Sequence, residues 1–190
     1  MVKFVILLLL IAGLGLGVYF ASFKKTPQYN NVPSKMKAVS KIRAVGDDEC
    51  KIQVNEAITL LKQKAPKHFQ LAVDYLGTIE CVEDGSDIFD YDQPARVKFG
   101  KLTMDEGVLW LSSAIVHEAC HVKQYNDFRQ ENLTKNVPDE VYKGKNAEGW
   151  CLEVQADVLE KMGSDKDTID YVKNSINEEY WKVPDRIIWW

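Results

Sequence analysis

The chain has 190 residues, of which 46% are hydrophobic and 27% are charged. These proportions are those of an ordinary globular protein, so they exclude wholesale disorder and predict one domain-sized core. Residues 1–46 contain seven basic side chains and no acidic one, whereas the remainder carries all 28 acidic side chains against 17 basic ones, a net charge of −11. A domain with this negative charge repels the phosphate backbone of nucleic acids, so we expect no nucleic-acid partner.

The N-terminus is a run of apolar residues. Residues 4–23 contain no charged side chain, and this run has about the length of a membrane-spanning helix. We therefore expect residues 1–23 to form an apolar helix that binds the membrane as an uncleaved single-pass anchor, with a cleaved export signal and a secreted protein as the alternative. The lysines that follow favour a cytoplasmic C-terminal side, whereas the cysteines favour the outside. The orientation stays open, with the extracytoplasmic side preferred.

A basic linker is expected at residues 24–46, because prolines, asparagines and lysines are scattered there without an apolar period. The folded domain should then occupy residues 47–190. Spacing of apolar residues and capping signals predict helices over about 48–65, 108–128 and 147–162, and a last helix capped by Ser164 or Asp165. Extended segments are expected at 69–73, 78–82 and 95–99, with an exposed loop at 83–93. The predicted fold class is α+β, mainly helical with a small sheet.

The four cysteines are Cys50, Cys81, Cys120 and Cys151. An even number of cysteines after an export-like segment indicates two disulfides, and four buried free thiols are the alternative if the domain faces the cytosol. Four cysteines allow three pairings. We favour Cys50 with Cys81 and Cys120 with Cys151, since each pair would join consecutive elements.

The segment His117-Glu118-Ala119-Cys120-His121 carries the chemistry of the chain. Two histidines four residues apart project from one face of a helix, so both can bind one ion. Glu118 is placed to polarise a water beside that ion. Imidazole nitrogens suit zinc, so we expect a Zn²⁺ cofactor. Cys120 is expected to pack or to form a disulfide.

A catalytic zinc site needs a third protein ligand. The remaining histidine, His68, lies far upstream, so we prefer Glu153 in the predicted helix after the motif. Asp157 lies one turn beyond Glu153 and would accept the outer N–H of a ligating histidine. The alternative is that Glu153 and Asp157 belong to a solvated helix face.

With these residues the chain resembles the gluzincin metallopeptidases, through His-Glu-x-x-His followed by Glu-x-x-Ala-Asp over about residues 108–162. These include the CAAX-processing and heat-shock membrane peptidases and the minimal single-domain gluzincins. The resemblance implies a zincin-like fold in which His117, His121 and Glu153 bind zinc, Glu118 is the general base and Asp157 supports a ligand histidine. It also implies an edge strand that holds extended substrate, for which we choose residues 97–102, and an oxyanion-stabilising side chain. Tyr142 is our first choice for that side chain, and the other candidates are His68, Tyr125 and Tyr171.

The function expected from the sequence is a zinc endopeptidase acting on a protein or peptide substrate. One alternative is a non-catalytic, membrane-tethered envelope protein whose zinc site is structural or vestigial. Such a site would have four protein ligands, with His68 or Cys120 as the fourth. The other alternative is a tethered binding module whose acidic face recruits a basic partner.

Overall fold

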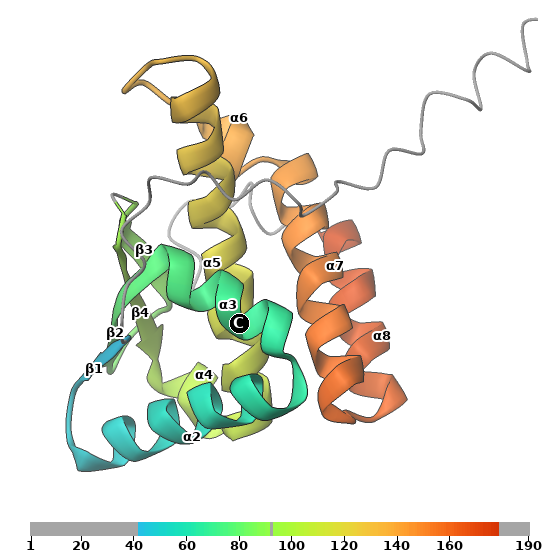
Figure 1. Ribbon diagram of the computed structural model, residues 1–190. Helices are drawn as coiled ribbons and strands as arrows, with labels where there is room; N and C mark the ends of the chain where they lie inside the picture. The colour runs from blue at the N-terminus through green and yellow to red at the C-terminus, as the bar shows by residue number, and fades with distance from the viewer. Residues whose placement is uncertain (1–41, 92, 179–190) are drawn as a thin grey trace, which may run out of the picture. The chain divides into compact units, whose positions relative to one another are not determined.

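The computed structural model describes residues 42–91 and 93–178, which contain helices and a four-stranded sheet (Figure 1). The predicted α+β class is confirmed. Helix α2, Asp48–Lys64, begins where the sequence predicts, because the Asp47 side chain accepts a hydrogen bond from the Cys50 backbone N–H at 2.8 Å. Two of its apolar residues, Ala57 and Leu61, are fully buried.

Helix α3, Pro66–Tyr75, lies where an extended segment was expected at residues 69–73, so that prediction was wrong. Pro66 favours the first turn of a helix, since its missing N–H would have no partner there. The helix then buries Leu71, Ala72 and Tyr75, which recur on one face. A short apolar run does not distinguish strand from helix by period alone, and here the proline decides.

The sheet has the strand order β1-β2-β4-β3. Its strands are β1 at Arg43–Val45, β2 at Leu76–Val82, β3 at Asp87–Asp90 and β4 at Ala95–Gly100. Strand β2 pairs in parallel with both β1 and β4, and β3 pairs antiparallel with β4. Strands were expected close to β2 and β4, but β1 falls in the expected linker and β3 in the expected loop. In β3, Ile88 is buried whereas Asp87 and Phe89 are exposed, and the acidic residues of this stretch conceal the strand in the sequence.

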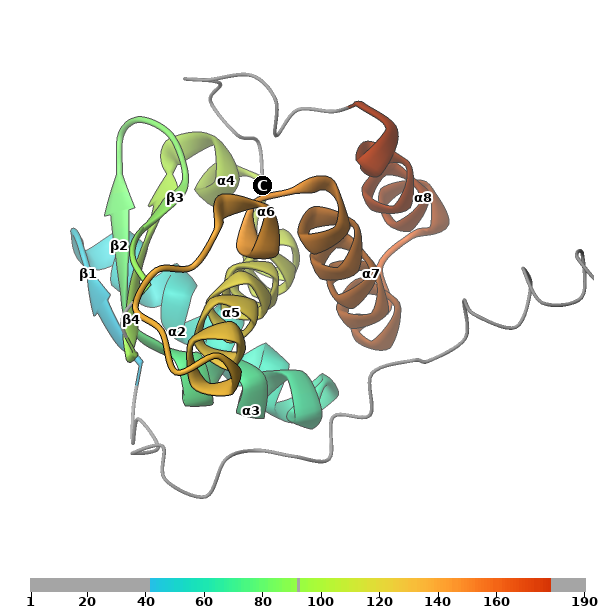
Figure 2. The ribbon, with the colours of Figure 1, turned by 90° about the horizontal axis from the view of Figure 1, so that it is seen from above.

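Helix α5, Val108–Glu131, lies between the sheet on one side and helices α7, Lys145–Met162, and α8, Lys166–Ser175, on the other (Figures 1 and 2). Two short helices, α4 at Lys101–Asp105 and α6 at Asp139–Tyr142, connect to its two ends. Helix α7 stops at Gly163, whose φ of +84° suits glycine. A 3-10 turn, Ile176–Glu178, follows α8. The long helices therefore place residues from the middle of α5 against the start of α7.

No helix within the described ranges is both long and apolar enough to cross a membrane. The anchor expected at residues 1–23 and most of the linker expected at 24–46 lie outside the described residues.

Candidate metal centre

Both motif histidines lie on α5 and are buried. His117 has no exposed surface, and only 4% of His121 is exposed. The helix starts after Gly107, which adopts a φ of +89° that other residues rarely tolerate. Four apolar residues of the same helix around the motif are also fully buried: Ile115, Val116, Ala119 and Val122. Because unpaired imidazoles are costly to bury, the two rings need polar partners inside the domain.

Glu148, in the first turn of α7, is the partner that both rings share. Its Oε2 lies 3.5 Å from His117 Nε2 and 3.3 Å from His121 Nε2, and the two Nε2 atoms are 2.9 Å apart. The carboxylate itself is buried. Gly144, before α7, lets the chain turn tightly here, since a Cβ would come within 2.8 Å of the Glu140 carbonyl oxygen. His117, His121 and Glu148 thus form a buried three-residue cluster that could hold a metal ion.

The distances between the donor atoms of this cluster match those between ligands around a small divalent cation. Four ligands placed about 2.1 Å from a zinc ion at tetrahedral angles lie about 3.4 Å from one another. The three observed separations of 2.9, 3.3 and 3.5 Å bracket that value. Two imidazole nitrogens and one carboxylate oxygen are also donors that zinc accepts.

Electrostatics in the cluster arise from burial and from the shared carboxylate. Burial lowers the pKa of His117, and its hydrogen bond to Glu148 offsets this only in part. Burial is also the largest influence on His121 and lowers its pKa, but the charge and hydrogen bond of Glu148, with the charge of Glu118, together outweigh burial and the net pKa is raised. Burial raises the pKa of Glu148, yet the His121 charge and hydrogen bonds from both rings hold it well below its usual range. The metal-free cluster therefore holds an ionised Glu148 carboxylate, and a cation bound there would compete with protons for the two Nε2 atoms.

A backbone carbonyl orients His121. Its Nδ1 lies 2.7 Å from the carbonyl oxygen of Tyr142, so Nδ1–H donates there and Nε2 faces the cluster. The Tyr142 hydroxyl, expected to stabilise an oxyanion, instead donates to Asp139 at 2.9 Å. Tyr142 contributes to the cluster through its main chain.

Glu118 is buried beside the three-residue cluster without belonging to it. It is 4% exposed, and burial raises its pKa to about 8, with the His121 charge opposing and the Glu148 charge reinforcing the shift. Tyr91 also lies near it: burial raises the pKa of Tyr91, and the charge of Glu118 raises it further. The Tyr91 ring packs edge-on against Tyr142, with centroids 4.6 Å apart. Sequence reasoning did not single out Tyr91, because it lies in a stretch interpreted as loop.

Neither Glu153 nor Asp157 belongs to the cluster around His117 and His121, which corrects the predicted ligand set. Glu153 is exposed, and Asp157 Oδ2 lies 3.1 Å from Nε2 of His68. Burial lowers the pKa of His68, although the Asp157 charge offsets part of the shift. Residues on α7 share the Glu148 face at intervals of three or four, which excludes Glu153. The carboxylate that replaces it, Glu148, was missed.

Both disulfides have the favoured pairing. Cys50 bonds to Cys81, and Cys120 bonds to Cys151, so the second bond joins α5 to α7 at the cluster. This bond was also the signal that could have found Glu148. Cys151 must face α5 to reach Cys120, and Glu148 lies one helical turn before it.

The expected substrate edge at residues 97–102 is also corrected. Strand β4 pairs with β2 at residues 95–100 and with β3 at residues 96–98, so β4 is an inner strand and not the edge of the sheet. Residues 101 and 102 belong to α4. Among the described strands, β3 is the outer one on this side, and Asp87 of β3 is near enough to Glu118 to raise its pKa.

Comparisons of the chain with protein-family models, with curated proteins and with solved structures find no match. Conclusions about function therefore rest on the residues of the cluster and on their surroundings.

Proposed function

We propose that this protein is a zinc-dependent peptidase with a zincin-like active site. The observation that carries the proposal is the separation of roles within one buried cluster. Three side chains, His117, His121 and Glu148, are spaced to hold an ion, and a fourth, Glu118, lies beside them as an additional carboxyl group. A peptidase of this type needs three protein ligands and one proton acceptor.

Each residue has a defined task in this proposal. A bound divalent cation supplies Lewis acidity, which lowers the pKa of water and polarises a carbonyl. The Tyr142 carbonyl keeps Nε2 of His121 directed at the cluster. Glu118 takes a proton from the water that attacks the peptide carbonyl, and then passes it to the nitrogen of the leaving amine as the C–N bond breaks.

The substrate would be a protein or peptide segment in extended form. Strand β3 offers an outer edge close to Glu118, and backbone pairing along such an edge holds a peptide without regard to its side chains. The two disulfides support an oxidising, extracytoplasmic location for the domain. We keep the membrane anchor at residues 4–23 as part of this proposal.

The burial of the cluster favours a second candidate, a non-catalytic protein with a structural metal ion. His117 has no exposed surface, and His121 and Glu118 are each 4% exposed. A structural zinc site has four protein ligands, however, and among the described residues the cluster has three. Neither expected fourth ligand is there, because Cys120 is in a disulfide and His68 pairs with Asp157.

The test compares two glutamates on the same helix. Purified protein should contain about one zinc per chain by plasma mass spectrometry and should cleave an unfolded protein. Glu148→Gln should lose the metal, whereas Glu153→Gln should keep it, because only Glu148 contacts the histidines. Glu118→Gln should keep zinc and lose cleavage. Zinc binding by all variants would refute the ligand set, and full zinc occupancy without cleavage in the wild type would leave the structural candidate.

A further inference from the structure

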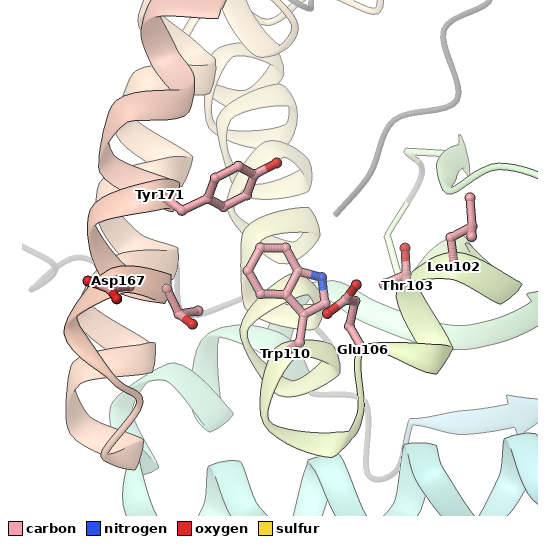
Figure 3. Close-up of a pocket in the computed structure, with 7 residues that line it drawn as sticks. Leu102, Thr103, Glu106, Trp110, Asp167 and Tyr171 are labelled. Carbon is pink, nitrogen blue, oxygen red and sulfur yellow. The ribbon is translucent and has the colours of Figure 1, made fainter.

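A groove with aromatic walls lies between α4 and α8, over the start of α5. It encloses about 570 Å³ and is lined by Leu102, Thr103, Glu106, Trp110, Asp167 and Tyr171, among others (Figure 3). We call it the α4–α8 groove. The Trp110 ring lies between the two walls in this view, with Glu106 beside it and Tyr171 on α8 facing it.

The walls of the α4–α8 groove combine apolar surface with negative charge. Leu102 and Tyr171 are 41% and 51% exposed, and the Trp110 and Tyr171 rings have centroids 6.2 Å apart. Glu106 and Asp167 stand on opposite sides, and neither makes an ion pair with any residue in the described ranges. Aromatic faces attract cations, and two carboxylates repel an acidic side chain. An arginine or lysine side chain satisfies both requirements, since its stem is apolar and its head is cationic.

The distance from the α4–α8 groove to the metal cluster suits one extended peptide that reaches both. Trp110 precedes His117 by seven residues, which is nearly two helical turns, so both side chains start from the same side of α5. The rise along the helix over seven residues is about 10 Å. An extended peptide covers that distance in about three residues.

We infer that the α4–α8 groove is a specificity subsite that receives an arginine or lysine side chain of a polypeptide substrate, about three residues from the bond that is cut. The inference rests on the proposed peptidase function. It adds a substrate class, namely polypeptides with a basic residue near the cleavage point.

The experiment has a cleavage arm and a binding arm. In the first, an unfolded protein is digested and its cut sites are mapped by mass spectrometry, for the wild type, for Glu106→Gln with Asp167→Asn, and for Tyr171→Ala. A control variant, Glu153→Gln with Glu160→Gln, removes two exposed carboxylates from α7 instead. In the second arm, the inactive Glu118→Gln protein, with and without the groove substitutions, is titrated with a labelled arginine-containing peptide and with its citrulline analogue.

We expect wild-type cut sites to be enriched in arginine or lysine at one position two to four residues away. The groove variants should lose this enrichment by about tenfold with unchanged zinc content, and the control should retain it. The arginine peptide should bind more tightly than the citrulline peptide only when Glu106 and Asp167 are present.

Separate outcomes refute the two proposals. Cleavage without a basic preference, or with a preference that survives the groove substitutions, overturns the subsite and leaves the peptidase standing. Absence of cleavage in zinc-loaded wild type refutes the peptidase, and equal binding of both peptides then overturns the groove as a site for basic side chains. Displacement of the arginine peptide by a synthetic peptide of residues 179–190 at similar concentration would assign the groove to the chain's own end and overturn the substrate subsite.

Discussion

Removal of the Cys120–Cys151 disulfide should weaken metal binding, whereas removal of Cys50–Cys81 should not. Cys120 immediately precedes His121, and Cys151 follows Glu148 by one helical turn, so this bond holds α5 and α7 together at the cluster. The other bond joins the first turn of α2 to β2. The test variants are Cys120→Ala with Cys151→Ala, and Cys50→Ala with Cys81→Ala.

The two disulfide bonds should contribute equally to the stability of the fold. Each spans a sequence separation of 31 residues, so loop-closure entropy assigns both about the same stabilisation, about 4 kcal/mol. In a domain of this size that should lower Tm by roughly 15 °C in either variant. An equal loss of stability removes general weakening of the fold as an explanation for any difference in metal affinity.

Metal affinity should differ between the variants by about tenfold. Without the Cys120–Cys151 bond, α5 and α7 still pack, but Glu148 and the histidines must be brought together by the ion itself, and that ordering reduces the net binding free energy by about 1.4 kcal/mol. The assay is competition with a chromophoric zinc chelator at a temperature where both variants are folded. Equal affinities in the two variants, or weaker binding only in the Cys50–Cys81 variant, would refute the reasoning.

Three further predictions follow from the same structure. Zinc affinity should rise with pH by up to about tenfold per pH unit while His121, whose pKa is raised, still holds its proton, because one proton leaves as the ion binds; chelator competition at several pH values would show a flat profile if this is wrong. In the metal-free protein, the Tm of the Glu118→Gln variant should exceed that of the wild type by more at pH 8 than at pH 5. The folded protein keeps the Glu118 proton up to a pKa of about 8 against an ordinary 4.5, so wild-type stability falls as pH rises through that window, and a pH-independent difference would count against it. Asp47→Ala should destabilise the protein by about 1 kcal/mol in urea unfolding, since it removes the cap on the Cys50 N–H, and an unchanged midpoint would show that the cap contributes nothing.

Local spacing was sufficient for the parts of the site that lie on one helix. His117, Glu118 and His121 are placed by the 3.6-residue repeat alone, and the structure brings both histidines to one cluster. The start of α2 at Asp48 and the end of α7 at Met162 are likewise set by short-range features, and both were predicted correctly. The favoured disulfide pairing, one of the three that the sequence left open, was confirmed by the structure.

Only the tertiary structure decided which carboxylate completes the cluster. Glu148 and Glu153 are five residues apart, which places them about 140° apart around α7, so packing against α5 selects one and turns the other to solvent. That rotation depends on the whole interface, including the Cys120–Cys151 bond. Two further features could not be predicted from the sequence. The Tyr142 carbonyl is a backbone group, which has no sequence signature. The outer position of β3 depends on the order of strands in the sheet, which is set by long-range pairing. The residues at positions 117–121 therefore specify a pair of histidines that could hold a metal ion, and the fold determines the rest of the cluster.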